Sequence, residues 1–241
     1  MTMIGRVLTL LTATKEITLK DGTSLNTGYD QFSFVEVVDY FSGEQLSVDI
    51  TTIGGHTPKQ DPTCLNHLPQ DDLKYYKGFM ETESQMLLPI DLDSLSEEQL
   101  HQYVGLFIPG GYAAIEEFCS SPSVYKLLKH FHTHQKPIGI IGAGAAALIH
   151  SEIPWIFSNY KMTCINGEIE DQLEEHLLHS KLPFHVAYIL GQLGGRTSFG
   201  TSMETHVVEY NELITAQNKF SAFDFAKQFA LKIKYTLKIA K

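Results

Sequence analysis

The chain is poor in cysteine, and it has no long apolar run. Only three of its 241 residues are cysteines, and Cys64, Cys119 and Cys164 are widely spaced. An odd number of scattered cysteines excludes a disulfide framework and is typical of a reducing compartment, so we expect a cytoplasmic protein. The longest apolar run, residues 137–149, is too short to span a membrane and is rich in Gly and Ala. Residues 1–14 fit an N-terminal strand better than a signal peptide.

Positive charge is scarce as well. The sequence has 18 Lys and Arg against 28 Asp and Glu, which gives a net charge of −10. Nucleic acid and anionic membrane both require clustered positive charge, so we expect neither as the main partner. Charged residues make up only 19% of the chain and apolar residues 43%, so much of it can be buried. We expect one domain over residues 1–241.

Short β-branched runs alternate along the chain with helical patterns. This alternation predicts βαβ units, and therefore an α/β fold with a doubly wound, mostly parallel sheet. Residues 54–95 contain four prolines and show no clear period. We interpret them as an irregular excursion over one sheet edge, because a segment of about 40 residues forms a poor core of its own. The expected strands cover residues 5–11, 46–53, 104–109, 137–141, 161–165, 206–210 and 213–215.

The helices show clear apolar faces and start signals. Residues 34–41 and 124–131 carry apolar side chains at helical spacing, and the second run follows Ser121 as an N-cap and Pro122 at the first helical position. Before the last helix, Ser221 and Asp224 have the spacing of a capping box. The acidic run of residues 168–175 is typical of a solvated helix face.

Two glycine-rich turns follow buried strands, at residues 109–112 and 142–144. In a doubly wound sheet, ligands bind at the carboxyl ends of strands, where both turns lie. Their backbone amides therefore predict a site for an anion or oxyanion. An equally open alternative is that the glycines only let helix and strand pack closely. The predicted ligand-binding residues are Gly110, Gly111, Tyr112, Gly142, Ala143 and Gly144.

The second turn also matches the dinucleotide fingerprint G-x-G-x-x-A at Gly142, Gly144 and Ala147. It comes late in the chain, whereas that fingerprint belongs to the first strand–helix turn. The acidic residue expected about 20 residues further on is displaced, since Glu168 lies 168 − 142 = 26 residues after Gly142. A dinucleotide-binding protein is therefore a weaker alternative.

Several short motifs occur in a characteristic order. They are Thr27-Gly28-Tyr29, Ile108-Pro109-Gly110-Gly111, Lys136-Pro137, His206-Val207-Val208 and a tail at residues 213–218 that reads Leu-Ile-Thr-Ala-Gln-Asn. This order resembles the ThiJ/PfpI superfamily, which contains the Parkinsonism-associated deglycase. Residues 129–132 and 155–157 make the chain most similar to its glutamine amidotransferase-like class one domain proteins. The resemblance implies a flavodoxin-like, three-layer α/β/α sandwich that is often a homodimer.

The residues that the resemblance implies for catalysis are missing. Enzymes of the superfamily carry a nucleophilic Cys followed by His at the second turn, where this sequence has Gly142 and Ala143. They also carry a Glu five residues after Gly28, where this sequence has Ser33. Glu36 lies one helical turn further, about 4.5 Å along the axis, and is no obvious substitute. Without a thiol, nothing at the turn can attack a carbonyl.

The sequence therefore predicts an atypical superfamily member, a pseudoenzyme that binds a small ligand or serves as a regulatory or interaction module. Glycine relaxes the strain of the turn, and the missing side chains open space there. We expect a roomier, less polar pocket that binds a small anionic or carboxylate-bearing ligand. Side chains of residues 54–95 that filled the space at the turn would exclude such a pocket. The tail motif departs from the superfamily too, with Ala216 for Gly and Lys219 for Pro.

An enzyme of altered mechanism, a hydrolase, lyase or isomerase, is the main alternative. Asp30 near the pocket rim and His206 before a neighbouring strand would form a general acid–base pair. In the simpler interpretation, Asp30 caps the following helix and His206 is a polar residue at a strand end. Cys119 and Cys164 fit packing roles, since no positive charge that would activate a thiol is evident.

Three histidines, His130, His132 and His134, gather near the end of a predicted helix. Only His130 and His134 share a face, and zinc requires more ligands. Histidine is also favoured near a helix C-terminus by the helix dipole. We therefore expect a structural role for these residues, with no metal site and no cofactor.

Overall fold

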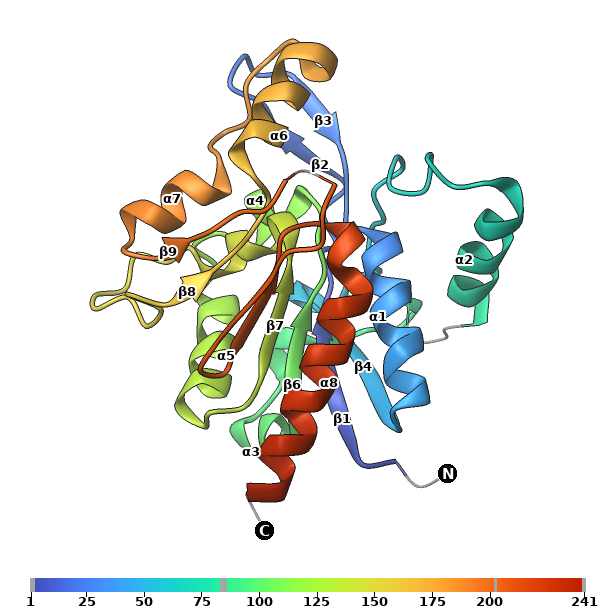
Figure 1. Ribbon diagram of the computed structural model, residues 1–241, viewed down its shortest axis with the longest axis vertical. Coiled ribbons are helices and arrows are strands. Elements are labelled where there is room, and N and C mark those ends of the chain that lie inside the picture. Colours follow the sequence, from blue (N-terminus) through green and yellow to red (C-terminus); the bar gives the residue numbers. More distant parts are fainter. Residues whose placement is uncertain (1–2, 83–85, 202, 240–241) are drawn as a thin grey trace.

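The structure is a computed structural model that describes residues 3–82, 86–201 and 203–239 (Figure 1). A seven-stranded sheet of order β10-β11-β7-β6-β1-β4-β5 runs through its centre. Neighbouring strands pair in parallel except β10 and β11, which are antiparallel. This confirms the doubly wound, flavodoxin-like architecture. The strands are β1 (Gly5–Leu10), β4 (Leu46–Thr52), β5 (Ile90–Asp91), β6 (Tyr103–Ile108), β7 (Ile138–Ile141), β10 (Val207–Tyr210) and β11 (Leu213–Ala216).

Helices cover both faces of the sheet, which makes the three layers of the sandwich (Figure 1). On one face, α1 (Gln31–Gly43) and α8 (Ala222–Ile239) lie side by side, and the rings of Phe41 and Phe229 are 5.7 Å apart. The other face is covered by α4 (Ala113–Glu117), α5 (Pro122–Thr133), α7 (Val186–Gln192) and the 3-10 helix η4 (Gly142–Leu148). Each face buries its own apolar cluster, and each fully buried Phe or Leu contributes about 1.5–3 kcal/mol.

Two of the three predicted helix starts are confirmed. The Asp30 carboxylate accepts the Phe32 N–H at 3.1 Å where α1 begins, and Ser121 caps α5 ahead of Pro122. The capping box before α8 is wrong. The Ser221 hydroxyl accepts the His206 N–H and donates to Asn218, so Asn218 caps the 3-10 turn η6 (Lys219–Ser221) that leads into α8.

The sequence predicts an irregular excursion over one sheet edge for residues 54–95, and in the structure this segment lies beside β4 and supplies the edge strand β5. The segment forms the 3-10 turn η1 (Ile53–Gly55), then α2 (Gln70–Thr82), and returns to add β5 beside β4 before the turn η3 (Leu92–Ser94). Leu65 and Tyr76 join the apolar cluster beneath α1 and α8, so the segment shares the core of that face.

Some elements differ from the sequence prediction. The strand expected at residues 161–165 is wrong in length and pairing: β8 (Lys161–Met162) pairs with β9 (Arg196–Thr197) in a separate ladder. β8 ends early because the Thr163 N–H donates its hydrogen bond to the Thr215 hydroxyl, at 2.8 Å, and not to a neighbouring strand. The hairpin β2 (Glu16–Thr18) and β3 (Ser24–Asn26) was not predicted. The remaining helices are α3 (Glu97–His101), α6 (Gly167–Leu173) and the π-helical η5 (Glu174–Leu178). Within the described ranges, none of the helices is long and apolar enough to span a bilayer.

Candidate functional site

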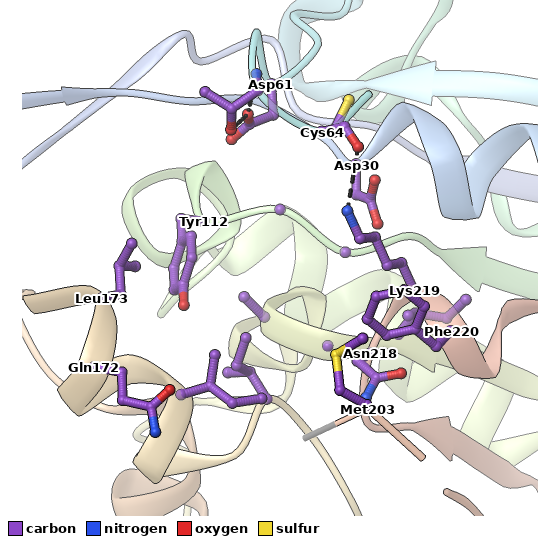
Figure 2. Close-up of a pocket in the computed structure, with 18 residues that line it drawn as sticks. Asp30, Asp61, Cys64, Tyr112, Gln172, Leu173, Met203, Asn218, Lys219 and Phe220 are labelled. Carbon is purple, nitrogen blue, oxygen red and sulfur yellow. Dashed lines mark hydrogen bonds between the residues drawn. The ribbon is translucent and has the colours of Figure 1, made fainter. Parts of the chain in front are cut away.

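A pocket with a volume of about 460 Å³ opens at the carboxyl ends of β6 and β7 (Figure 2). The glycine turn after each strand contributes to its lining, and α6 and the 54–95 segment form walls. Apolar side chains such as Ile165, Ile169 and Leu173 line it together with a few polar ones. A concave, largely apolar cavity with a few polar groups is typical of a small-molecule site.

Gly142 holds the backbone of the second turn in a left-handed conformation, with φ of 54°. A Cβ built at Gly142 would meet nothing closer than the Gln217 carbonyl oxygen, at 3.6 Å. The turn therefore has room for a side chain, and only the conformational cost of φ > 0, roughly 1–2 kcal/mol for other residues, favours glycine. Gly142 thus has a left-handed backbone with space for a side chain beside it, but it supplies no reactive group.

Three further glycines, Gly28, Gly111 and Gly144, are required by close backbone approach. A Cβ on Gly111 would lie 2.1 Å from the Gly28 carbonyl oxygen. A Cβ on Gly28 would lie 2.2 Å from the Lys59 carbonyl oxygen. A Cβ on Gly144 would lie 2.3 Å from the Pro109 carbonyl oxygen, so Gly144 packs the two turns together and does not line the pocket. This corrects the expectation for Gly144.

The other five predicted ligand-binding residues do line the pocket. They come from both turns, and they are Gly110, Gly111, Tyr112, Gly142 and Ala143.

Asp30 lines the pocket from the start of α1. Its Cβ lies 3.5 Å from where a Cβ on Gly110 would be, which places it beside the first turn. Burial raises the pKa of the Asp30 carboxyl, although the charge of Lys219 and hydrogen bonds from Ser33 and Phe32 act against the rise. Asp30 therefore caps α1 and also presents to the pocket a carboxyl group that gains a proton more readily than usual.

Lys219 contributes a positive charge to the pocket lining. Its ammonium donates to the Cys64 carbonyl at 3.3 Å and lies 3.0 Å from His67 Nδ1. Figure 2 shows it pointing toward Asp30, on the opposite side of the pocket from Tyr112 and Leu173. Sequence reasoning noted Lys219 only as a departure from a usual Pro. That departure, in a motif next to a predicted site, was the signal that could have identified it.

Cys64 and Asp61 form the wall contributed by the 54–95 segment. Burial raises the pKa of the Cys64 thiol to about 12, and the charge of Asp30 adds to the rise. The thiol is therefore protonated at neutral pH and is a poor nucleophile. Asp61 accepts the Thr27 hydroxyl at 2.7 Å and the Thr63 N–H at 2.8 Å. These side chains border the cavity without filling it.

The structure does not bring His206 into the pocket. His206 lies just before β10, where its Nε2 is 3.2 Å from the Ser198 hydroxyl. It is absent from the pocket lining. The acid–base pair of Asp30 and His206 is thus not assembled, and both residues have the simpler roles considered above. Ser33 is buried and donates to the Asp30 carbonyl at 3.2 Å, and Glu36 accepts the Tyr76 hydroxyl.

The other two cysteines lie away from the turns. Cys164 is fully buried and donates to the Ile165 carbonyl at 3.4 Å, and burial raises the pKa of its thiol well above the ordinary value. Burial likewise raises the pKa of Cys119. Both are protonated side chains in packing roles.

The acidic run is not wholly a solvated face, which corrects the sequence prediction. Glu170 and Glu174 are 0% and 3% exposed. Burial raises the pKa of Glu170 to about 8. Burial also opposes ionisation of Glu174, but hydrogen bonds from Lys181, the Leu182 N–H and His185 outweigh it and lower the pKa of Glu174.

The family description "DJ-1/PfpI family" matches residues 24–232, most of the chain. The human glutamine amidotransferase-like class 1 domain-containing protein 1 is 31% identical over 136 residues, which cover 55% of this chain and 59% of that protein. A protein/nucleic acid deglycase HchA of Staphylococcus aureus is 23% identical over 147 residues, 60% of this chain and 49% of that one. The matched stretch thus spans about three-fifths or less of these relatives' length.

Solved structures share the fold at low sequence identity. Rapid Encystment Protein 24 kDa of Francisella tularensis aligns with a TM-score of 0.81 at 20% identity, over 95% of this chain and 99% of that one. Glyoxalase III of Candida albicans aligns with a TM-score of 0.75 at 14% identity, over 96% and 98%. With the family match over residues 24–232, these findings place the chain in the DJ-1/PfpI family.

Proposed function

We propose that this DJ-1/PfpI family member lacks Cys-nucleophile chemistry and binds a small carboxylate-bearing ligand beside Gly142, as a ligand-binding or regulatory module. One observation carries the proposal. The Gly142 turn keeps its left-handed backbone, with φ of 54°, next to an open pocket of about 460 Å³, yet it presents no side chain. The cysteine in the described lining, Cys64, is held protonated by burial.

The lining supports a carboxylate group with a short apolar body. Lys219 supplies a positive charge, and N–H groups of the two glycine turns supply further donors. Ile165, Ile169 and Leu173 offer an apolar surface to the rest of the ligand. Asp30 repels a carboxylate when ionised and donates to it when protonated. Burial raises the pKa of Asp30, which favours the protonated carboxyl that donates to the ligand.

The catalytic half of the proposal is tested by turnover. Purified protein is incubated with methylglyoxal and, separately, with a glycated amino acid, and consumption is compared with a no-protein control. We expect equal rates, because neither Gly142 nor Ala143 offers a nucleophile or a base. Any consumption above the control would contradict the proposal, and its disappearance in Cys64→Ser would assign the chemistry to the thiol that lines the pocket.

The binding half is tested by calorimetry with a series of two- to five-carbon 2-oxo and 2-hydroxy acids and their neutral amides. We expect an acid to bind the wild type, its amide to bind more weakly, and Lys219→Met to weaken acid binding at least tenfold. Lys161→Met, at an exposed lysine outside the pocket, is the control and should bind as the wild type does. Equal binding by Lys219→Met, or no binding of any acid, would overturn the proposal.

The two alternatives receive less support. The altered-mechanism enzyme loses one member of its acid–base pair, because His206 lies outside the lining. The dinucleotide reading requires glycines that approach a pyrophosphate at the start of a long helix. Here η4 is a seven-residue 3-10 helix, and Gly144 faces the Pro109 carbonyl.

A further inference from the structure

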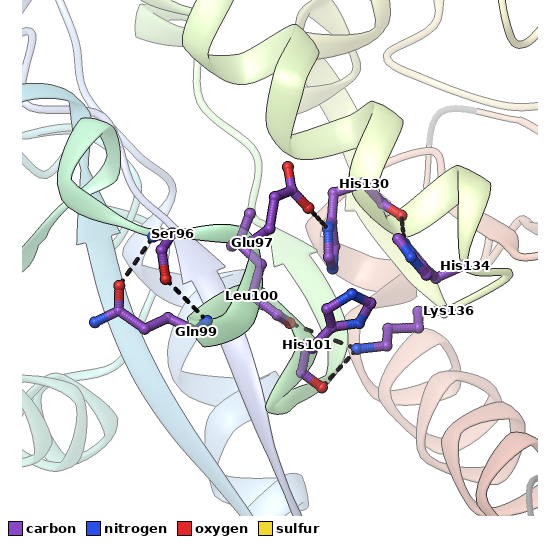
Figure 3. Close-up of polar contacts among 8 residues, drawn as sticks. All are labelled: Ser96, Glu97, Gln99, Leu100, His101, His130, His134 and Lys136. Carbon is purple, nitrogen blue, oxygen red and sulfur yellow. Dashed lines mark hydrogen bonds and ion pairs between the residues drawn. The ribbon is translucent and has the colours of Figure 1, made fainter.

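Three histidine rings meet at the amino ends of the central strands, at the end of the sheet opposite the pocket. His101 ends α3, just before the amino end of β6, while His130 and His134 lie at the end of α5, just before the amino end of β7 (Figure 3). Their ring centroids are 4.3, 4.5 and 4.9 Å apart. One ring nitrogen from each residue lies within 4.8 Å of the other two. Sequence reasoning paired His130 and His134 but missed His101.

Hydrogen bonds leave one nitrogen available on two of these rings. His130 Nδ1 lies 2.6 Å from the Glu97 carboxylate, and His134 Nδ1 lies 2.8 Å from the His130 carbonyl oxygen. Both oxygens act as acceptors, so each Nδ1 carries the hydrogen and each Nε2 carries a lone pair. The His130 side chain is 0% exposed, and its Nε2 has no hydrogen-bond partner among the described residues. A buried lone pair without a donor is the state in which imidazole binds a metal ion.

We propose that His101, His130 and His134 form a binding site for a divalent transition-metal ion, with zinc as the reference ion. Imidazole nitrogen is a preferred ligand of zinc, and three histidines with an open fourth position are an established coordination set. Glu97 is then a positioning residue, since a carboxylate on the far ring nitrogen fixes the tautomer and orientation of a ligating histidine.

The geometry needs only a small adjustment to bind an ion. Tetrahedral coordination with bonds near 2.1 Å requires nitrogens about 3.4 Å apart, compared with the 4.8 Å limit here. His101 and His134 are exposed, so small shifts of their rings toward the buried His130 meet little resistance, and the ion enters from solvent. The ion would link α3 to α5 at the amino ends of β6 and β7, far from the pocket.

The charges around the cluster are compatible with a cation. Glu97 supplies a negative charge, and the Lys136 ammonium is directed to the Leu100 and His101 carbonyl oxygens.

The test uses the full chain without an affinity tag, stripped of metal by a chelator and titrated with zinc in a calorimeter. We expect one zinc per chain, and with cobalt as the probe, the visible absorption bands of tetrahedral coordination. His101→Asn and His134→Asn should each weaken zinc binding at least tenfold. Because both residues are exposed, the melting temperature without metal should stay the same. Glu97→Gln should weaken binding 10- to 100-fold while keeping the cobalt spectrum.

Two control variants keep the result specific. His176→Asn changes an exposed histidine outside the cluster, and Asp171→Asn changes a second group of possible ligands, formed with Glu174 and His185. That group already holds an ion pair between Glu174 and Lys181, at 2.8 Å. Both controls should bind zinc as the wild type does. Unchanged zinc affinity in His101→Asn and His134→Asn, or no zinc binding by the wild type, would overturn the proposal.

Discussion

Replacing Glu170 by Gln should make the protein more stable in mild alkali. Glu170 lies on α6 with 0% of its surface exposed, and neither carboxylate oxygen has a hydrogen-bond partner of normal geometry among the described residues. Burial raises its pKa from the usual 4.5 to about 8, with Glu174 and Asp171 adding to the rise and the Val186 N–H opposing it. Glu170 is therefore protonated in the native protein at pH 7.

The sign and size of the effect follow from proton linkage. Between pH 4.5 and 8 the unfolded chain releases the Glu170 proton while the native protein keeps it, so the free energy of unfolding falls as the pH rises. Each pKa unit is worth about 1.36 kcal/mol, so the rise from 4.5 to about 8 corresponds to a loss of about 5 kcal/mol across that range. Gln has the same shape and no proton to lose.

The measurement is urea unfolding at pH 5 and pH 8.5 for the wild type, Glu170→Gln and Glu175→Gln. Glu175 is an exposed neighbour and serves as the matched control. Glu170→Gln should match the wild type within about 1 kcal/mol at pH 5 and exceed it by several kcal/mol at pH 8.5. The reasoning would be refuted if the unfolding free energies of Glu170→Gln and the wild type differed by the same amount at both pH values. That result would mean that Glu170 titrates alike in the native and unfolded states.

Four further outcomes are expected. Gly142→Ala should cost about 1–2 kcal/mol of unfolding free energy, because φ at Gly142 is 54° although the new Cβ has room. Gly144→Ala should cost more, because the new Cβ would lie 2.3 Å from the Pro109 carbonyl oxygen. Equal costs of the two variants in urea unfolding would contradict this. Calorimetry at pH 5.5 and 8 should show tighter carboxylate binding at the lower pH, since burial raises the pKa of Asp30, and Asp30→Asn should remove that dependence. Asp30→Ala should cost about 1 kcal/mol through the lost α1 cap, and unchanged stability would argue against that role. The homodimer implied by the family resemblance predicts a mass of 2 × 27.0 = 54.0 kDa by light scattering, and a mass of 27.0 kDa would exclude it.

The sequence predicts the site where local rules determine it. The turns at Gly110 and Gly142 follow buried strands, and parallel strands bring their carboxyl ends to one edge, so both turns were expected in one pocket. The Ser121 and Asp30 caps likewise follow from residue type and spacing. These features depend on a few neighbouring residues.

Long-range approach of separate segments explains what the sequence missed. Cys64 reaches the pocket because Lys59 and Asp61 exchange backbone hydrogen bonds with Tyr29, more than 25 residues earlier in the chain. His101 joins His130 and His134 only because α3 packs near the end of α5. No periodicity or spacing encodes either contact. The burial of Glu170 and Glu174 was missed for the same reason, since an acidic run by itself favours solvent.

Residues of the family-like motifs and of the second glycine turn have structural roles in this chain. Gly28, Gly111 and Gly144 each lack room for a Cβ, since a backbone carbonyl oxygen lies 2.1–2.3 Å from where it would be. In the tail motif, Gln217 accepts the Gly200 N–H and donates to the Thr201 carbonyl, and Asn218 caps η6. Replacing any of these residues disturbs packing whether or not the protein is an enzyme.

Gly142 is different, because its surroundings would admit a side chain. Packing therefore does not require glycine at this position, and a side chain there would fit without disturbing the fold. Under the proposed function, the family motifs specify the backbone that builds the pocket, and the residue at position 142 decides whether a nucleophile is present.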